Sequence, residues 1–449
     1  MNILCGYNAN IDSVYRTKGS EISQLLESFN HDDIIEKIEN PPNRIDTITD
    51  FIAGLIICMR EGSGAEWLVH DDSVFEFLKD NFFDRSLIRM GGNCGIMSNV
   101  LSIMGASKVV PNVAKPSKTQ LDAFTKGTIV FPGCNDLNGI DEDKELIHFV
   151  FDFKKGDKFT LSGNTITVPR ENRFIATYDH LNIELAINPD FEYYARENIH
   201  NMDGALISGF HMLQENYPDG SSYVDKFQKS LKQIKIWKQL NSELLLHVEL
   251  GHFSNEKLAQ YVFSSLAEYV DGMGMNEDEL AMLHGIHEVP TNKILQMQAI
   301  PILKASVQCI SKTGLQKFII HTREFTLCVC KPDVFDAICE LEAMNFGVKC
   351  AAVFADTGKL KNREYVEKTS SILDESDFGL KEVQKIKEYI NGQEYNSGVY
   401  GNFSDYSVGI IPTLISENPI STVGLGDTFC AGTYLKQLEL VKTQQTNKI

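Results

Sequence analysis

Segments of strand character alternate with segments of helix character along most of this chain, and this alternation restricts the folds open to it. Apolar runs of strand length occur at residues 3–7, 146–153, 205–209, 244–250, 269–273, 317–321, 351–355 and 408–412. Candidate helices lie at residues 93–104, 222–240, 276–284, 292–312, 332–344 and 428–440. Such alternation is typical of βαβ units. We therefore expect an α/β fold with a mainly parallel sheet covered by helices on both faces.

One segment departs from this pattern. Between residues 140 and 177 polar and apolar side chains alternate, as in Lys158-Phe159-Thr160-Leu161. Alternation of this kind is typical of antiparallel strands with one solvated face. We predict a smaller β-rich unit inserted into a large α/β unit. The large unit then comprises mainly residues 1–10, 85–135 and 180–449, and the inserted unit comprises residues 140–179 and part of 11–84.

The charge balance excludes several classes of partner. With 42 Lys and Arg against 61 Asp and Glu, the net charge is −19. This value argues against binding to nucleic acid or to an anionic membrane surface.

The ten cysteines form no C-x-x-C pair, which favours free thiols in a reducing compartment over a zinc site. The amino terminus lacks a signal-peptide pattern and no apolar run approaches a membrane span, so we expect a cytoplasmic protein.

A glycine-rich turn near the carboxyl terminus carries the sharpest chemical signal. Gly424-Leu425-Gly426-Asp427 directly precedes a predicted helix. The first amides of a helix present free N–H groups and a favourable dipole to an anion. A carboxylate at this position can also take the proton from a hydroxyl that attacks phosphorus. The turn therefore permits phosphoryl transfer to an alcohol, and a loop with an Asp N-cap is the structural alternative.

Polar side chains follow three other predicted strands, where open parallel sheets bind their ligands. These segments are His247-Val248-Glu249, Asn276-Glu277-Asp278-Glu279 and His321-Thr322-Arg323. Glu249 and Glu279 are hard oxygen donors suited to Mg²⁺. The alternatives are a buried His–Glu pair and a solvated acidic helix start.

The amino-terminal half offers candidate ligand contacts of a different kind. Asn10 and Asp12 follow the first strand and can bond sugar hydroxyls, with an Asx turn as the alternative. Gly91-Gly92-Asn93 opens a helix, and its glycines permit close approach of backbone to a ligand. Ordinary helix–sheet packing would explain the same glycines.

A local basic group stands out in this acidic chain. Lys154, Lys155 and Lys158 precede Arg170 and Arg173 on the predicted inserted unit. An arginine fork can bind two phosphate oxygens at once. The group is therefore a candidate phosphate clamp.

Together the motifs resemble the archaeal ADP-dependent sugar kinases, that is, the ADP-dependent phosphofructokinases and glucokinases of the ribokinase-like superfamily. The segment from Gly424 to Asp427 resembles the superfamily signature, and the other two motifs are similar to the family's His-x-Glu and Asn-x-x-Glu. The resemblance runs from about residue 3 to residue 440. It implies a three-layer αβα domain with a β-rich lid. It also implies transfer of the β-phosphoryl group of MgADP to fructose 6-phosphate, giving fructose 1,6-bisphosphate and AMP.

The resemblance also implies roles for individual residues. Asp427 would be the general base, and the amides around Gly424, Leu425 and Gly426 would hold the migrating phosphoryl group. Glu249 and Glu279 would position Mg²⁺. The sugar side would comprise Asn10, Asp12, Gly91, Gly92, Asn93 and His148, and the nucleotide side Asn276, His321, Thr322 and Gly426. Arg173 resembles a lid arginine that binds either the nucleotide phosphate or the sugar phosphate.

Glu66 bears on which sugars are candidate substrates. It resembles the glutamate that engages glucose in this family, so glucose is a second candidate substrate; an exposed glutamate is the structural alternative. The choice of ADP over ATP as donor rests on the resemblance. Rival interpretations are an ADP-dependent glucokinase, an ATP-dependent ribokinase-like sugar or nucleoside kinase, and a non-catalytic sugar or nucleotide sensor. Sugar preference and oligomeric state, monomer or small homo-oligomer, stay open.

Overall fold

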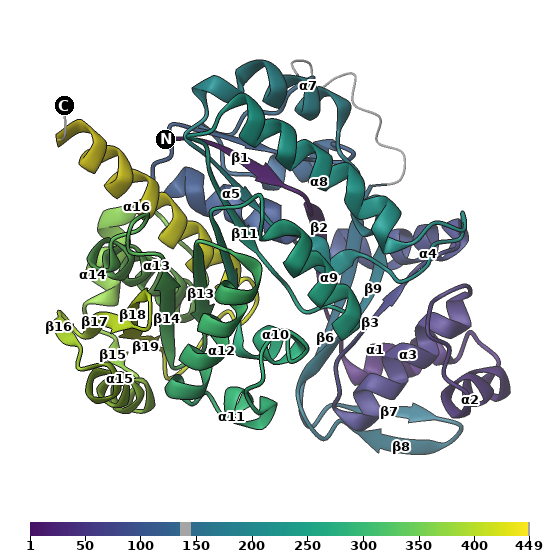
Figure 1. Cartoon of the computed structure of the whole chain (residues 1–449). Helices are drawn as coiled ribbons and strands as arrows, with labels where there is room; N and C mark the ends of the chain where they lie inside the picture. Colours follow the sequence, from purple (N-terminus) through teal and green to yellow (C-terminus); the bar gives the residue numbers. More distant parts are fainter. Residues whose placement is uncertain (135–144, 448–449) are drawn as a thin grey trace.

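The computed structural model describes residues 1–134 and 145–447, which form two main sheets of different make-up and two further two-stranded pairs (Figure 1). The larger sheet has ten strands in the order β16-β17-β18-β14-β13-β12-β11-β10-β1-β5. They are β1 (Asn2–Gly6), β5 (Lys108–Pro111), β10 (Gly204–Ile207), β11 (Leu245–Glu249), β12 (Gly272–Met275), β13 (Lys317–His321), β14 (Phe325–Cys330), β16 (Gln393–Tyr395), β17 (Gly398–Phe403) and β18 (Tyr406–Pro412). Strands from β5 to β13 run parallel, and those from β14 to β16 are antiparallel to their neighbours.

Helices cover both faces of this sheet. One face packs against α7 (Pro189–Asn198), α8 (Tyr223–Leu240), α9 (Glu256–Leu266), α12 (Ala299–Thr313) and α15 (Asp377–Ile390). The other packs against α5 (Asn93–Ile103), α13 (Ala337–Thr357), α14 (Arg363–Ser370) and α16 (Leu425–Asn447). The short helices are α6 (Lys118–Ala123), α10 (Glu277–Met282) and α11 (Thr291–Leu295), of which α10 packs against α9, α11 and β13. The predicted three-layer αβα architecture is confirmed.

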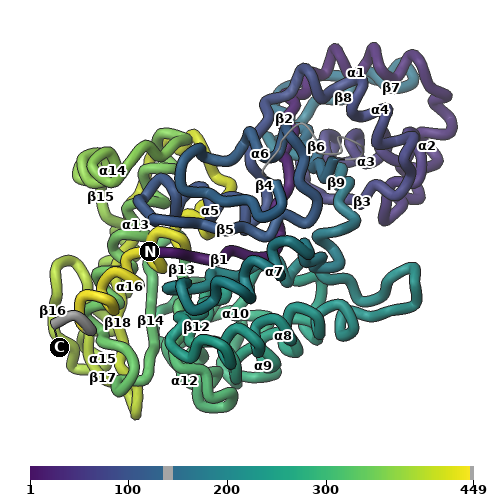
Figure 2. The backbone as a smooth tube through the Cα atoms, turned by 90° about the horizontal axis from the view of Figure 1, so that it is seen from above, coloured from purple at the N-terminus to yellow at the C-terminus, as the bar shows by residue number. Residues whose placement is uncertain are grey.

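The smaller sheet stands to one side of the larger one (Figure 2). Its order is β3-β9-β6-β2-β4, with β2 (Asn10–Arg16), β3 (Ala65–Leu68), β4 (Leu87–Gly91), β6 (Ile147–Phe153) and β9 (Asn172–Tyr178). One face packs against α1 (Gly19–Leu26), α2 (His31–Glu39), α3 (Ile48–Glu61) and α4 (Asp72–Phe82). We call these elements the small unit. On β6, Phe149 and Phe151 enter this core, and His148 and Asp152 lie on the opposite face, as expected from side-chain alternation.

The small sheet is mixed rather than wholly antiparallel. Strand β6 pairs antiparallel with β9 but parallel with β2, and β3 pairs parallel with β9. The alternating segment after β6 forms a separate hairpin of β7 (Lys158–Leu161) and β8 (Asn164–Thr167), which packs against α1. Strand β4 belongs to the small sheet by its hydrogen bonds, although residues from 85 onward were predicted in the large unit. Residues 135, 140–144 and 448–449 of the predicted segments lie outside the described residues.

Three secondary-structure predictions were wrong. Residues 351–355 lie inside α13 rather than in a strand, because this helix is buried against both the sheet and α16 and so lacks a polar face. That helix also begins at Ala337 rather than at residue 332. Asp336 caps its first turn, because its side chain accepts a hydrogen bond from the amide of Cys339. The segment 292–312 forms two helices, α11 and α12, separated at Met297 with φ +52°.

Two further observations concern the chain as a whole. All ten cysteines are unpaired thiols, and most of them are buried. Within the described ranges, we find no helix that combines the length and apolar character needed to cross a membrane. The remaining short elements are the pair β15 (Asp374–Glu375) and β19 (Leu414–Ile415), together with the 3-10 turns Phe83–Arg85, Asn182–Glu184, Ile199–Asn201 and Phe210–Met212.

Candidate active site

A cleft of about 310 Å³ lies between the solvated face of the small sheet and the first turns of α5 and α16. It brings together residues from opposite ends of the sequence. The predicted residues that line it are Asn10, Asp12, Glu66, Gly92, Asn93, His148, Arg173, Gly424 and Asp427. The cleft therefore combines most of the predicted sugar-side residues with the predicted base.

Asp427 lies in the first turn of α16, beneath the glycine turn. Gly424 has φ +74°, a left-handed conformation that favours glycine, and an added Cβ would lie 3.0 Å from Ile96 Cδ1. Asn93 Nδ2, at the start of α5, donates a 2.7 Å hydrogen bond to Asp427 Oδ1. Burial raises the pKa of Asp427 to about 6, although the Asn93 hydrogen bond lowers it. The carboxylate is therefore ionised at neutral pH yet unusually basic for an aspartate.

The glycine pair that precedes α5 leaves space for polar side chains. A Cβ on Gly91 would lie 2.1 Å from Asp12 Oδ1, and one on Gly92 would lie 2.5 Å from the carbonyl oxygen of Asn8. Asn10 Nδ2 donates a 2.9 Å hydrogen bond to Asp12 Oδ1. Burial raises the pKa of Asp12. The glycines thus pack β4 closely against the polar end of β2.

A second polar group crosses the small sheet from β6 to β3. His148 Nε2 lies 3.0 Å from Asp179 Oδ2, and its Nδ1 lies 3.8 Å from Glu66 Oε1. Thr177 Oγ1 donates a 2.6 Å hydrogen bond to Glu66 Oε1. Burial alone would lower the pKa of His148, but the neighbouring carboxylates outweigh it and raise the pKa to about 9. Glu66 is therefore held at the cleft edge beside a cationic imidazole.

The carboxyl ends of β11, β12 and β13 place a second charged group next to Asp427. His321 Nε2 lies 2.6 Å from Glu249 Oε1, and His247 Nε2 lies 3.9 Å from Glu249 Oε2. Burial alone would raise the pKa of Glu249, but the two imidazoles lower it to about 2. Glu249 in turn raises the pKa of Asp427. The strand ends and the predicted base therefore form one electrostatic unit.

Glu279 forms a capping box with Asn276 at the start of α10. The Asn276 amide donates to Glu279 Oε2 at 2.9 Å, and the Glu279 amide donates to Asn276 Oδ1 at 2.9 Å. Burial, aided by the charge of Glu249, raises the pKa of Glu279 to about 8. Glu279 is therefore mainly protonated at neutral pH, and a divalent cation bound by the oxygens of Glu249 and Glu279 would favour its ionised form. The residues therefore fit Mg²⁺.

A different trio of potential ligands also surrounds Glu249. In the part of the chain that the structure describes, His247, Glu249 and Cys430 form the one buried group of this kind, with potential ligand atoms within 4.8 Å of one another. Glu279 lies outside this trio.

Several predicted residues have local structural contacts instead of lining the cleft. Thr322 Oγ1 bonds the carbonyl oxygen of Phe325 at 2.9 Å and so closes the turn between β13 and β14. Arg170 Nε donates to the carbonyl oxygen of Gly62 at 3.2 Å. Of the predicted basic group, Arg173 alone lines the cleft, where its Nε lies 3.9 Å from Asp152 Oδ1.

Sequence reasoning missed five charged or polar residues of the cleft lining. These are Asn8, Arg89, Asp152, His211 and Ser421. Arg89 could have been found, because it lies two residues before Gly91 on a strand and therefore shares its face. His211 carried no such signal, since it lies in a short 3-10 turn after β10.

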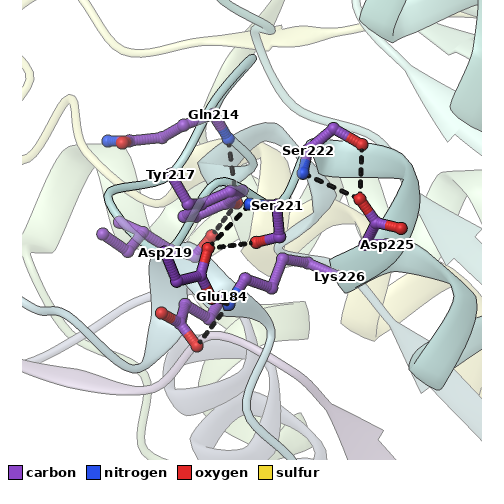
Figure 3. A network of polar contacts seen from close by, with 9 residues as sticks. Glu184, Gln214, Tyr217, Asp219, Ser221, Ser222, Asp225 and Lys226 are labelled. Atoms are coloured by element: carbon purple, nitrogen blue, oxygen red, sulfur yellow. Dashed lines mark hydrogen bonds and ion pairs between the residues drawn. The ribbon is translucent and has the colours of Figure 1, made fainter.

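A polar network fixes the loop that follows His211 (Figure 3). The buried Lys226 Nζ lies 3.1 Å from Glu184 Oε2 and 2.9 Å from Asp219 Oδ2. Tyr217 Oη accepts a hydrogen bond from the Gln214 amide at 3.0 Å. This network joins the loop before α8 to the turn that follows β9. It therefore anchors one wall of the cleft.

Comparison with known proteins places these features in context. A family described as the ADP-specific phosphofructokinase/glucokinase conserved region matches residues 1–436. The chain is 29% identical to the ADP-specific phosphofructokinase of Methanosarcina acetivorans, over 98% of this chain and 94% of the relative. It is 26% identical to the ADP-dependent glucose/glucosamine kinase of Pyrococcus abyssi, over 98% of this chain and 94% of the relative. A solved ADP-dependent kinase in complex with fructose-6-phosphate and ADPβS matches with TM-score 0.75 and 25% sequence identity. The match covers 97% of this chain and 93% of the solved chain.

Proposed function

Because this chain belongs to the ADP-specific phosphofructokinase/glucokinase family, we propose that it transfers the β-phosphoryl group of MgADP to fructose 6-phosphate, giving fructose 1,6-bisphosphate and AMP. The Methanosarcina relative is named for phosphofructokinase activity, and the matching solved structure is a complex with fructose-6-phosphate and an ADP analogue. The observation that carries the proposal is the position of Asp427, buried at the start of α16 and open to the cleft.

Asp427 would act as the general base. As the sugar hydroxyl attacks phosphorus, a carboxylate oxygen of Asp427 accepts the hydroxyl proton, a task typically worth ~10²–10⁴-fold in rate. The Asn93 hydrogen bond at 2.7 Å holds the carboxylate and leaves its second oxygen for the substrate. The raised pKa of Asp427 supports this role, because a more basic carboxylate is a better proton acceptor.

The start of α16 would stabilise the migrating phosphoryl group. The amides of Leu425, Gly426 and Asp427 lie in the first turn, where N–H groups have no partner within the helix. Fixed donors of this kind stabilise charge that develops on phosphoryl oxygens. Gly424 makes this approach possible, since its left-handed conformation sets the direction of the turn.

Carboxylate oxygens of Glu249 and Glu279 would hold the metal ion, directly or through water. When bound, Mg²⁺ screens the negative charge of the diphosphate. His321 keeps Glu249 ionised through its 2.6 Å contact. We assign His321, Asn276, Thr322 and Gly426 to the nucleotide side. His321 and Asn276 bond these two carboxyl groups. Thr322 follows His321 in the chain, and a Cβ on Gly426 would lie 3.3 Å from His321 Cε1.

The small unit would act as a lid over the sugar. Its solvated face supplies Asn10, Asp12, His148 and Glu66, and the large unit supplies Asn93 and Asp427 on the opposite wall. Closing this cleft would exclude water, which competes with the sugar hydroxyl as phosphoryl acceptor. We also propose a cytoplasmic location. The charge of −19 supports an enzyme that acts on small molecules, with neither nucleic acid nor an anionic membrane surface as partner.

Glucose is a second candidate acceptor, and Glu66 is the observation that favours it. Its carboxylate reaches the cleft, and Thr177 holds it in place. A carboxylate is suited to a neutral sugar hydroxyl and would repel a phosphate at the same position. The Pyrococcus relative is named as a glucose and glucosamine kinase.

A matrix of donors and acceptors tests the proposed function. Purified protein with Mg²⁺ is offered ADP or ATP, each with fructose 6-phosphate or glucose, and AMP and sugar phosphate are measured separately. We expect AMP formation with ADP and fructose 6-phosphate. Turnover with ATP and none with ADP would contradict the donor assignment. No turnover with any pair would favour the sensor alternative.

A further inference from the structure

A cavity of about 900 Å³ lies outside the cleft, where the helices α11, α12 and α15 meet (Figure 1). It is larger than the cleft, which measures about 310 Å³, and the two share no lining residue. None of the residues that line it carries a role in the proposed phosphoryl transfer. The cavity therefore needs an explanation of its own.

Each of the three helices contributes one lysine to the cavity lining. These are Lys293 of α11, Lys304 of α12 and Lys385 of α15. The carboxylates of Glu288 and Glu382 also line the cavity, and Lys312 Nζ, which lies outside the lining, is 3.8 Å from Glu288 Oε1. The cavity is thus lined by more cations than anions, although the chain as a whole has a net charge of −19.

The three lysines differ in what they contact. Lys385 Nζ donates a hydrogen bond to Glu382 Oε1, and Lys304 Nζ lies 5.4 Å from the centroid of the Tyr389 ring. Lys293 makes no hydrogen bond or ion pair with any residue that the structure describes. Lys293 is therefore the lysine of this cavity that is available to a ligand.

The cavity wall already binds one anionic group, which the chain itself supplies. Glu382 is 2% exposed, and its carboxylate accepts hydrogen bonds from the Ala299 amide, at 2.8 Å, and from Lys385. The next amide, that of Ile300, lies in the first turn of α12, where N–H groups have no partner within the helix. Ile300 also lines the cavity. The start of this 15-residue helix and Lys293 therefore favour a further anionic group in the cavity.

Apolar side chains line another part of the cavity. Phe378, in the first turn of α15, has 39% of its surface exposed, and Val289, Pro290 and Pro301 also line the cavity. An exposed aromatic ring stacks with a flat ring of a ligand, and prolines and aliphatic side chains bury its edges. A ligand that uses both parts of the lining combines a flat apolar body with an anionic group.

We infer that this cavity is a second ligand site, which binds an organic phosphate with a flat ring. The phosphate contacts Lys293 and the start of α12, since lysine and free helix amides both bind phosphate oxygens. The ring lies against Phe378. The inference does not rest on the proposed kinase activity, because it involves no residue of the cleft.

Pyridoxal 5′-phosphate is a suitable probe, since it combines a flat ring and a phosphate with an aldehyde. The unprotonated amino group of a lysine adds to the aldehyde carbon, water leaves, and borohydride reduces the resulting C=N bond to a stable amine. Among the described residues that line the cleft there is no lysine, so labelling reports on the cavity. Peptide mapping should show saturable labelling of Lys293, at least about tenfold faster than that of Lys232 at low probe concentration. Lys232 is the matched reference, an exposed and likewise unpaired lysine of α8.

Two analogues and two variants separate the phosphate from the ring. Pyridoxal, which lacks the phosphate, should lose the preference for Lys293, and pyridoxine 5′-phosphate, which lacks the aldehyde, should protect Lys293. Phe378→Ala should raise the probe concentration for half-maximal labelling by roughly 3–10-fold, because the stacked ring is lost. Tyr193→Ala removes an exposed ring of α7 outside the cavity and should change nothing. Circular dichroism confirms that both variants fold, as expected for partly exposed positions.

Three results would overturn the inference. The first is equal labelling of Lys293 and Lys232, or labelling of Lys293 that rises with the probe without saturating. The second is an equal preference for Lys293 with pyridoxal, which would remove the phosphate from the site. The third is unchanged half-maximal labelling in Phe378→Ala, which would remove the ring. None of these measurements requires turnover of a sugar, so the inference and the proposed function can fail separately.

Discussion

The two sheets supply the proposed functional residues in different ways. On the large sheet the functional side chains stand at the ends of strands, as Glu249 and His321 do, because helices bury both faces along the strand length. On the small sheet only one face is covered, and functional side chains occur at every second position, as His148, Val150 and Asp152 do on β6. On the large sheet, side chains can therefore reach a ligand at only a few positions, where the backbone geometry is fixed. On the small sheet they can reach it from one whole face.

This difference suggests a division of tasks. Groups at strand ends and helix starts are held by backbone and capping bonds, which suits proton transfer and phosphoryl stabilisation, where small displacements are costly. Side chains on a solvated face can change one at a time without disturbing the apolar face behind them. They are therefore suited to deciding which sugar binds.

The largest effect is expected at the strand-end and helix-start group. Asp427→Ala should lower kcat ~10²–10⁴-fold for every sugar that the wild type accepts, because the proton acceptor is lost. Steady-state assays measure the rate, and calorimetry should show sugar binding preserved. Asp122→Ala removes an exposed carboxylate at a distance and serves as control. An unchanged rate in Asp427→Ala would leave the reaction without its base.

The apolar face of the small sheet should control folding rather than chemistry. Phe151 is fully buried, and its ring centroid lies 4.9 Å from that of Phe51 and 5.0 Å from that of Phe82. Phe151→Ala should therefore lower the free energy of unfolding by about 3–5 kcal/mol. Fluorescence of Trp67, which packs against Phe174, follows unfolding of this unit in a Trp237→Phe background.

An exposed neighbour provides the matched comparison. Lys154→Gln, in the same background, should change the free energy of unfolding by less than about 0.5 kcal/mol. A loss of sugar binding in Phe151→Ala without loss of stability would contradict the assignment of this face to folding alone.

The solvated face should show a smaller and more selective effect. Glu66→Ala should raise KM for glucose by roughly 10–100-fold, because a hydrogen bond to a charged group is lost, and should change KM for fructose 6-phosphate by less than about threefold. Thr177→Val removes the hydroxyl that holds Glu66 and should weaken glucose binding in the same direction. Equal losses for both sugars would refute a role for Glu66 in sugar choice.

The smallest effect concerns the pH dependence of the rate. The pKa of Asp427 is raised to about 6, so kcat/KM should fall as the pH drops through this value and the base becomes protonated. Asn93 donates a hydrogen bond that lowers this pKa. Asn93→Ala should therefore move the fall of kcat/KM on the acid side, the acid limb of the pH profile, to higher pH. Asn99→Ala, on the same helix but bonded to the carbonyl oxygen of Ala123, should leave the limb in place. A shift to lower pH in Asn93→Ala would contradict the assignment.

The division between the sheets also explains what could be predicted from the sequence. Strand-end motifs such as His247-Val248-Glu249 are short and local, so their place in an α/β fold follows from strand prediction. The family inferred from these motifs is the family that matches residues 1–436. Arg89 and Asp152 escaped prediction because their place in one cleft depends on the pairing of β4, β2 and β6, which lie far apart in the sequence. The strand predicted at 351–355 failed because burial on several sides removes the helical pattern from α13.

The sugar preference of Asp427→Asn tests the division of tasks most directly. Its residual activity is measured with fructose 6-phosphate and with the second-best sugar that the wild type accepts, and the ratio of the two kcat/KM values is compared with that of the wild type. If Asp427 performs only the chemistry common to all acceptors, both values fall ~10²-fold or more and the ratio stays within about twofold. A ratio that changes tenfold would show that the strand-end group also selects the sugar, and would contradict the account.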